Sequence, residues 1–235
     1  MSVQALLKPR SVALVGANEK MTFGGHAARN LMGCKDTVRS YFVNPNRDTV
    51  LGEPCYHDLS ELPEVVDCVV IAVPKAGVND ILEQAGAMGT KAAVVYASGY
   101  TEEHSEEGRE LDALLRAIAA RYGMSVMGPN CMGMLNSVDG INLMGLGFAD
   151  EFRDRDHKVA IVSHSGSLSG ALTRRGNFPV AYQLSIGNAT VTAMEDYVEF
   201  FAEDDSVKVI ALYMEGLKKP EVFLRALKKA ALNRK

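Results

Sequence analysis

A histidine lies between two serines directly after an apolar run, in the segment Val162-Ser-His-Ser-Gly166. Two kinds of phosphate chemistry fit this segment. The imidazole of His164 could carry a phosphoryl group, because histidine can act as a nucleophile near neutral pH. Alternatively, Ser165 and Gly166 could open a helix whose unpaired N–H groups bind phosphate. The sequence on either side of the segment has to show which of these two roles applies.

A second group of turns has the composition of a nucleotide-binding edge. The first turn places Gly16 and Gly24 before a helical stretch, where glycines let backbone N–H groups approach a pyrophosphate. The spacing is not the GxGxxG fingerprint. The second turn, Asn44-Pro-Asn-Arg47, carries a cation where NAD-binding domains place Asp or Glu. Arg47 therefore disfavours NAD and suits a phosphorylated ribose, as in NADP or coenzyme A (CoA).

Composition and charge argue against several classes of function. The chain has 235 residues and a net charge of -4, which disfavours a nucleic-acid partner. No apolar run is long enough to span a membrane, and no leader is expected because Pro9 and Arg10 interrupt the start. The four cysteines show no CxxC spacing and the five histidines form no cluster. We therefore expect a cytoplasmic protein with free thiols and no metal site.

Short apolar runs, each followed by a Gly/Pro/Asn/Ser turn, predict a parallel sheet that is covered on both faces. They lie at 11–18, 38–46, 65–75, 91–100 and 124–130. Helical spacing is clearest at 111–123, where Gly123 marks the end. Five such units predict a doubly wound α/β fold, which we assign to a first domain at 1–150.

A second α/β unit is expected at 151–235. Residues 140–156 show no clear hydrophobic periodicity and end in a run of charged residues. This pattern predicts a linker between the domains. Apolar runs at 158–166, 180–188 and 207–216 predict three further strands. A sheet of only three strands is small, so this domain looks incomplete. Its open edge is compatible with a homo-oligomer.

An ordered series of motifs resembles a known family. VGAN, VNPN with Arg47, VDCVVIAVP, ASGYTEE and GPNCMG are followed by VAIVSHSGSLSGAL, LSIGN and LYMEG. This order is similar to the CoA-binding part of NDP-forming (ADP-forming) acyl-CoA synthetases, relatives of the succinyl-CoA synthetase α subunit. The resemblance implies a Rossmann-like CoA-binding domain followed by an incomplete flavodoxin-like domain of the succinyl-CoA synthetase type. The activity it implies joins a carboxylic acid to CoA through acyl-phosphate and phosphohistidine intermediates.

The resemblance also implies roles for single residues. Arg47 would face the 3′-phosphate of CoA and Asn130 its thiol. Glu215 would be the catalytic carboxylate that pairs with the family's phosphohistidine. The full CoA-binding set would be Gly16, Thr22, Phe23, Gly24, Arg47, Pro74, Lys75, Ser98, Gly99 and Asn130. The phosphate-binding set would be Ser165, Gly166, Ser185 and Asn188.

The same resemblance disfavours His164 as the phosphoryl carrier. In the family that carrier lies in an SHTG-like loop beyond the strand that ends here in LYMEG, and the slot of His164 is usually glutamine. The phosphohistidine segment and an ATP-grasp module are therefore expected from a partner or from a remaining C-terminal part, and ATP or ADP would act only through that ATP-grasp module. Val191 and Ala193 stand where the family often has aspartates, whereas Asp196 matches a later acid.

Two other functions stay open. The chain could be a non-catalytic, CoA-responsive regulatory module, or an NADP-dependent oxidoreductase domain. In the leading interpretation the chain alone binds CoA without full turnover. Cys131 is expected to be a small buried residue rather than a nucleophile, since the sequence offers it no histidine partner.

Overall fold

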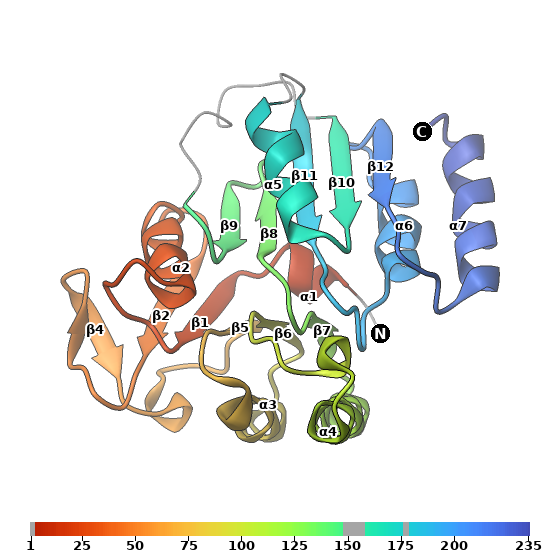
Figure 1. Ribbon diagram of the computed structural model, residues 1–235. Coiled ribbons are helices and arrows are strands. Elements are labelled where there is room, and N and C mark those ends of the chain that lie inside the picture. The colour runs from red at the N-terminus through yellow and green to blue at the C-terminus, as the bar shows by residue number, and fades with distance from the viewer. Residues whose placement is uncertain (1–2, 148–157, 176–178) are drawn as a thin grey trace.

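Runs of buried apolar residues form a seven-stranded sheet in the order β3-β4-β2-β1-β5-β6-β7. The computed structural model (Figure 1) describes residues 3–147, 158–175 and 179–235. All pairs in this sheet are parallel except β3 with β4. The strands are β1 (Ser11–Val15), β2 (Arg39–Val43), β3 (Thr49–Val50), β4 (Glu53–Tyr56), β5 (Cys68–Ile71), β6 (Ala92–Val95) and β7 (Ser125–Met127). The five predicted parallel strands are confirmed, and the β3–β4 pair is an addition.

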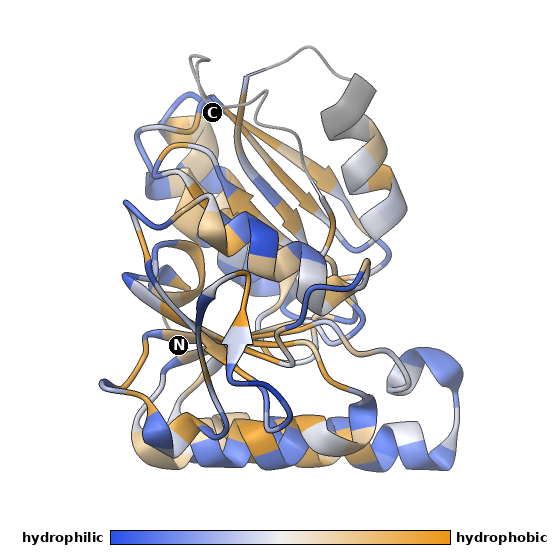
Figure 2. Cartoon of the chain, turned by 90° about the vertical axis from the view of Figure 1, so that its left-hand side faces the viewer, coloured by the Kyte–Doolittle hydropathy of each residue, from blue (hydrophilic) through white to orange (hydrophobic). Residues whose placement is uncertain are grey.

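Successive residues of the central strands enter two different cores, because side chains alternate across a strand. Ala13 and Val15 of β1 belong to one cluster, with residues of α3 (Lys75–Met88) and α4 (Glu106–Tyr122). Val12 and Leu14 belong to the other. Both faces of the sheet are therefore covered, as the continuous apolar runs predicted, and Figure 2 shows these apolar strands enclosed between the helices.

The helix predicted at 111–123 is longer at its start than its apolar pattern indicated. It begins at Glu106, where Ser105 Oγ accepts a hydrogen bond from the Gly108 N–H at 3.0 Å. A serine cap with acidic residues in the first turn stabilises a helix N-terminus. Gly123 ends the helix in the left-handed conformation. The predicted stop at Gly123 is confirmed.

The second sheet has five strands, in the order β12-β10-β11-β8-β9, so the prediction of three strands is wrong. The three predicted strands are present as β10 (Val159–Ser163), β11 (Val180–Ser185) and β12 (Val209–Tyr213), and all are parallel. The hairpin of β8 (Gly133–Asn136) and β9 (Ile141–Met144) adds antiparallel to β11. Part of the segment predicted as a linker is therefore strand β9, and the rest of it from residue 148 to 156 lies outside the described residues.

Helices complete both layers (Figure 1). In addition to α3 and α4 they are α1 (Gln4–Leu7), α2 (Phe23–Met32), α5 (Gly166–Arg175), α6 (Met194–Glu203) and α7 (Pro220–Leu232), with short 3₁₀ turns at Leu59–Glu61 and Thr101–Glu103. Helix α2 packs against β9, and α6 packs against α7. The chain thus has α/β architecture throughout, as predicted.

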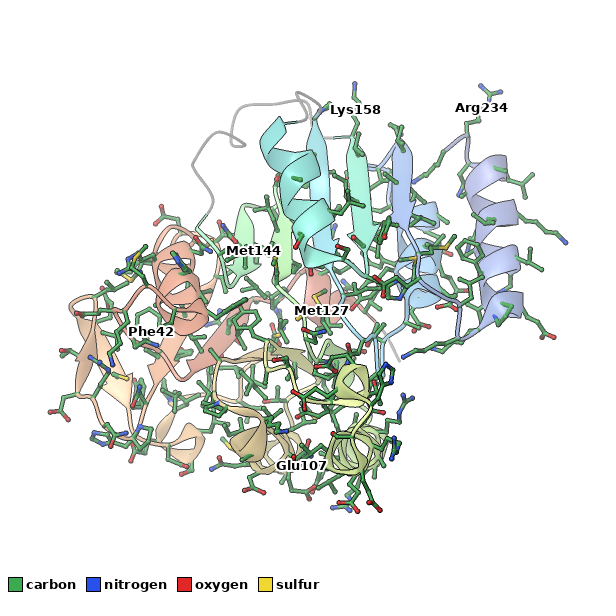
Figure 3. The ribbon with its side chains drawn as sticks, viewed as in Figure 1. Phe42, Glu107, Met127, Met144, Lys158 and Arg234 are labelled. Atoms are coloured by element: carbon green, nitrogen blue, oxygen red, sulfur yellow. The ribbon has the colours of Figure 1, made fainter. Side chains whose placement is uncertain are left out.

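The two sheets share one hydrophobic core. The cluster that contains Leu14 also contains Met127 of β7, Met134 of β8 and Tyr182 of β11, all fully buried. Figure 3 shows Met127 in the middle of the molecule, between the layers, and Glu107 on the outer helix layer. Because β8 and β9 precede residue 150 but pair in the second sheet, the chain passes from the first sheet to the second between Met127 and Gly133. The predicted domain boundary at 150/151 itself falls outside the described residues and stays a prediction.

Candidate functional site

The carboxyl ends of the parallel strands of both sheets open onto two cavities. This is the edge at which open α/β sheets bind ligands. The edge cavity, about 520 Å³, lies where β1, β2 and β5 end. The central cavity, about 680 Å³, lies where β6 and β7 of the first sheet and β10, β11 and β12 of the second sheet end. The turns singled out in the sequence therefore face two spaces, not one.

The central cavity brings together the predicted CoA-binding and phosphate-binding groups. Ser98 and Asn130 from the first group line it with Ser165 and Asn188 from the second and with Glu215. Its full lining is Phe23, Tyr96, Ser98, Glu102, Asn130, Cys131, Met132, His164, Ser165, Gly166, Ser167, Ser185, Gly187, Asn188, Glu215, Gly216, Leu217 and Lys218. Residues from six segments far apart in sequence thus share one space.

The loop after β11 lies directly against the turn after β7. The Asn188 N–H donates to Pro129 O at 3.0 Å, and the Thr190 N–H donates to Gly128 O at 3.1 Å. Gly187 makes this approach possible, because a Cβ at that position would lie 2.3 Å from Pro129 O, and its φ is +55°. The contact fixes the predicted phosphate-binding loop relative to the predicted CoA-binding turn.

Glu102, which is half-buried, forms a second connection between the sheets. Its carboxylate accepts hydrogen bonds from the Gly99 N–H at 2.6 Å, the Tyr100 N–H at 3.2 Å and the Asn188 side-chain amide. Burial alone would raise the pKa of the Glu102 carboxyl, but these hydrogen bonds outweigh it and the pKa is lowered. An ionised Glu102 therefore orients Asn188 toward the first sheet.

His164 and Glu215 are connected by a hydrogen bond in which the backbone N–H of Glu215 is the donor. The His164 N–H donates to Tyr213 O at 3.2 Å, and the Glu215 N–H donates to Nδ1 of His164 at 3.2 Å. Burial lowers the pKa of the imidazole, although the Glu215 carboxylate acts in the opposite direction. The imidazole ring is thus held at the carboxyl ends of β10 and β12.

Lys218 supplies the cation of the central cavity. Its Nζ donates to Asn188 O and to Ala189 O, both at 2.7 Å. Although Lys218 is exposed as a whole residue, desolvation around the ammonium group lowers its pKa, and Arg116 lowers it further. The Lys218 and Lys219 N–H groups donate to Glu195, which is buried. The segment after β12 is therefore tied to the loop after β11.

Ser165 begins helix α5 and faces the same cavity. Its Oγ accepts from the Leu168 N–H at 3.4 Å, as an N-terminal cap does. Gly166 lies so close to Met132 that a Cβ would be 2.8 Å from the sulfur. Ser185 Oγ accepts from the Met132 N–H at 3.1 Å. Ser165, Gly166 and Ser185 thus lie together, and the first N–H groups of α5 point positive charge toward them.

The edge cavity holds the other predicted turns. Gly16 and Pro74 line it, with Asn44, Pro45 and Asn46. Residues that the sequence reasoning did not name complete it: Val15, Val43, His57, Asp58, Leu59, Ala72, Val73, Gly77, Ile81 and Gln84. This mostly apolar lining, with a few polar groups, has the character of a small-molecule site.

Five predicted residues line neither cavity. Thr22 caps α2, where its Oγ1 accepts from the Gly25 N–H at 3.4 Å, and Gly24 packs against Gly16 O. Lys75 pairs with Glu107 at 2.9 Å. The remaining two are Arg47 and Gly99: Gly99 packs against Lys75, and Arg47 follows the lining residue Asn46. For Arg47 the described residues provide no side-chain hydrogen bond or ion pair, so its guanidinium is available to a ligand.

Sequence reasoning also missed functional candidates in the central cavity. Glu102 stands in the quoted ASGYTEE motif, and Lys218 comes two residues after LYMEG. Their proximity to a motif was the available signal. Cys131, by contrast, is buried as predicted, and burial raises the pKa of its thiol to about 12.

In the described part of the chain no three His, Cys, Asp or Glu side chains are grouped as a metal ion would need. Among the helices that the structure describes, none combines the length and the apolar character required to cross a membrane.

Comparison with known families matches both parts of the chain. Residues 10–137 match the family described as "CoA binding domain". Residues 156–235 match the family described as "Succinyl-CoA ligase like flavodoxin domain". The match to the first family covers more than half of the chain.

Individual relatives extend over almost the whole chain. A trans-feruloyl-CoA synthase, FCS1, from an unknown prokaryotic organism is 38% identical over an alignment of 237 positions that covers 97% of this chain and 33% of that protein. The α subunit of an ADP-forming acetate–CoA ligase II from Pyrococcus furiosus is 32% identical over 94% of this chain and 48% of its own length. This chain therefore spans between a third and a half of these relatives.

A solved structure has the same arrangement. It is the acetyl-coenzyme A synthetase 1 of Candidatus Korarchaeum cryptofilum, described as dinucleotide forming and in complex with phosphate and ADP. It superposes with a TM-score of 0.89 at 31% identity, over 98% of this chain and 50% of that one. The two-sheet architecture is thus shared with a protein of known structure.

Proposed function

Because the chain belongs to the CoA-binding domain family and continues into a succinyl-CoA-ligase-like flavodoxin domain, we propose that it supplies the CoA site and the acyl-phosphate site of an NDP-forming acyl-CoA synthetase. The observation that carries this proposal is the central cavity, where the turn after β7 meets the loops of the second sheet. In such a space the CoA thiol can meet an acyl phosphate.

The edge cavity is proposed to take the adenosine end of CoA. Its lining is apolar around Val43, Val73 and Ile81, which suits a purine ring, and Asn44 and Asp58 add polar groups at the side. Arg47, next to this cavity, is proposed to bind the 3′-phosphate, because a guanidinium forms strong bidentate hydrogen bonds to phosphate.

The central cavity is proposed to hold the reacting groups. The CoA sulfur would attack the acyl carbon, the bond between that carbon and the phosphate oxygen would break, and inorganic phosphate would leave. Asn130 would lie near the thiol, while the N–H groups at Ser165 and Gly166 would hold the phosphoryl oxygens. Ser185 and Asn188 would complete the phosphate site.

Phosphoryl supply is proposed to depend on an ATP-grasp partner, through which ATP or ADP would act. The relatives above are two to three times longer than this chain, which leaves room in them for such a part. Glu215 would pair with the phosphohistidine of the complete enzyme, which the ATP-grasp part would charge. Four buried free cysteines favour a cytoplasmic location.

Calorimetric titration of the chain with CoA and with dephospho-CoA tests the proposal. Arg47→Ala should weaken CoA binding by roughly tenfold, because a charge-assisted hydrogen bond contributes about 1.5–3 kcal/mol, and should leave dephospho-CoA binding unchanged. Arg10→Ala, which removes the same charge from an exposed side chain paired with Asp67, is the matched control. Absence of CoA binding to the parent chain would refute the proposal, and saturable binding of NADPH instead would favour the oxidoreductase alternative.

A further inference from the structure

The hydrogen bond between Glu215 and His164 fixes the tautomer of the histidine. A peptide N–H is only a donor, so the Glu215 N–H, 3.2 Å from Nδ1, requires a lone pair on that nitrogen. In a neutral imidazole the proton must then be on Nε2. Burial of the ring, which lowers its pKa, favours this neutral form.

This tautomer determines what the ring can do in the central cavity. A nitrogen that carries a hydrogen has no free lone pair, so Nε2 cannot attack phosphorus, and the lone pair of Nδ1 is engaged by Glu215. Nε2 can, however, donate a hydrogen bond. His164 lines the cavity beside Ser165 and Gly166, and Nε2 donates no hydrogen bond to another described residue.

We propose that His164 is a fixed, uncharged hydrogen-bond donor to a phosphoryl oxygen in the central cavity, with its tautomer set by the Glu215 backbone, and that it is not a site of phosphorylation. The ligand would be a phosphate oxyanion, either that of an acyl phosphate or inorganic phosphate. This inference rests on the proposed function of the cavity. It adds a residue that determines how the phosphoryl group is held.

The charges around the cavity explain why a donor is needed there. The carboxylates of Glu215 and Glu102 line the same space and would repel a phosphate dianion. The ammonium group of Lys218 is engaged by two carbonyl oxygens. A donor on His164, next to the N–H groups that open α5, partly offsets this repulsion.

A glutamine can reproduce both contacts of this histidine tautomer. Its Oε1 can accept from the Glu215 N–H while its Nε2 donates into the cavity. A leucine has similar bulk but neither contact. His164→Gln should therefore bind phosphate and acetyl phosphate within about threefold of the parent chain, and His164→Leu should bind both at least about tenfold more weakly. His104→Leu, at an exposed residue outside the cavity lining, should bind as the parent does.

Titrations with inorganic phosphate, acetyl phosphate and CoA distinguish this inference from the proposed function. CoA affinity should be the same in all four proteins, and its loss in the parent would refute the proposed function instead. If CoA binds but the parent binds neither phosphate nor acetyl phosphate, or if His164→Leu binds them as the parent does, the inference is wrong. If His164→Gln weakens the binding of phosphate and acetyl phosphate as much as His164→Leu does, the inference is also wrong.

Nuclear magnetic resonance of the parent chain gives a readout that does not depend on any variant. A long-range ¹H–¹⁵N spectrum at neutral pH should show His164 as the neutral tautomer with the proton on Nε2, and its Nε2–H signal should shift on addition of phosphate. After incubation with acetyl phosphate, mass spectrometry should find no phosphoryl adduct on His164. An Nδ1–H tautomer, or an adduct on His164, would overturn the inference.

Discussion

The side-chain amide of Asn130 donates a hydrogen bond to Oδ1 of Asn188 at 3.3 Å. One residue lies in the turn after β7 of the first sheet and the other in the loop after β11 of the second. Asn188 also donates to Glu102 and, at 3.5 Å, to Thr101 Oγ1. A single asparagine therefore aligns the predicted thiol end of CoA with the predicted phosphate site.

Removal of that side chain should loosen both parts of the site. Asn188→Ala removes one charge-assisted hydrogen bond from the Glu102 carboxylate, which keeps the Gly99 and Tyr100 N–H donors, so we expect the free energy of unfolding to fall by about 1–3 kcal/mol. Urea denaturation followed by circular dichroism measures this. Asn46→Ala, at an exposed turn residue, should change it by less than about 0.5 kcal/mol. An Asn188→Ala variant as stable as the parent would contradict the role of this residue as a connection between the sheets.

Alanine substitutions at Gly16 and Gly52 provide a matched test of whether the close backbone contact of Gly16 at the edge cavity contributes to stability. Both glycines have a left-handed backbone, with φ of +87° and +80°. A Cβ at position 16 would lie 2.5 Å from Ala72 O, whereas no atom lies within 4 Å of one at position 52. Gly52→Ala should therefore cost only the backbone strain, about 1–2 kcal/mol.

Gly16→Ala adds the clash with Ala72 to that strain, so it should be more destabilising than Gly52→Ala and should also weaken CoA binding. The comparison is made by thermal unfolding of both variants and by calorimetry with CoA. Equal destabilisation by the two substitutions would show that the approach of Gly16 to Ala72 is of no energetic consequence.

Cys131 lines the central cavity but should be chemically inert. Burial raises the pKa of its thiol to about 12, and only a thiolate reacts rapidly with electrophiles. Iodoacetamide at pH 8 should leave Cys131 unmodified in the folded chain and alkylate it in urea, as peptide mass spectrometry can show. Cys131→Ala should retain CoA binding. Rapid alkylation of the folded chain that CoA suppresses would instead indicate a nucleophile at this position.

His164 should make the stability of the chain depend on pH. Burial lowers its pKa in the folded state below the ordinary value of 6.5, against the opposing effects of Glu215 and Glu195 and with a further lowering by Lys218. The unfolded chain then binds the proton more readily. The stabilisation by neutral His164 is complete above about pH 6.5 and is lost as the pH falls through the folded-state pKa.

Urea unfolding of the parent and of His164→Gln between pH 7.5 and pH 5 measures this dependence. The glutamine side chain that replaces His164 does not titrate in this range. The stability of the variant should therefore fall less steeply than that of the parent. Parallel slopes would mean that His164 titrates alike in the folded and unfolded chains.

Sequence pattern predicted the parallel strands because each is an apolar run between turns, such as Ser11–Val15 and Cys68–Ile71. It could not predict that Gly133–Asn136 and Ile141–Met144 join the second sheet. These strands have four residues each, and Asn136 pairs with Tyr182, far along the chain. Only tertiary packing selects that partner, so the second sheet was predicted too small.

The candidate site was predictable to the extent that it consists of turns at strand ends. Asn130, Ser165 and Asn188 stand in motifs of turn-forming residues, and the structure places them in one cavity. Lys218 stands close to the LYMEG motif, but its contacts were not predictable, since its partners are the backbone carbonyls of residues 188 and 189, which carry no residue-specific signal. The separation of the turns into two cavities likewise depends on how the sheets are packed.

A hydrogen bond between Asp112 and Thr190 also connects helix α4 of the first layer to the loop after β11. This connection can be tested by itself. Thr190 Oγ1, in the loop after β11, donates to Oδ1 of Asp112 on α4, and both residues are buried. Oδ2 of Asp112 accepts from Arg116 at 2.8 Å. The carboxylate therefore accepts hydrogen bonds on both oxygens, and a hydrogen bond to a carboxylate contributes about 1.5–3 kcal/mol.

Thr190→Val preserves the shape of the side chain and removes only the donor, so it should lower the free energy of unfolding by that amount. Thr49→Val, at an exposed position of β3, is the control and should have an effect below about 0.5 kcal/mol. In an Asp112→Asn background the Thr190→Val substitution should cost less, because a neutral acceptor binds the hydroxyl more weakly. If the cost is the same in both backgrounds, the two residues are not coupled, and the other contacts of the loop after β11, such as its backbone hydrogen bonds to Gly128 and Pro129, hold it against the first sheet.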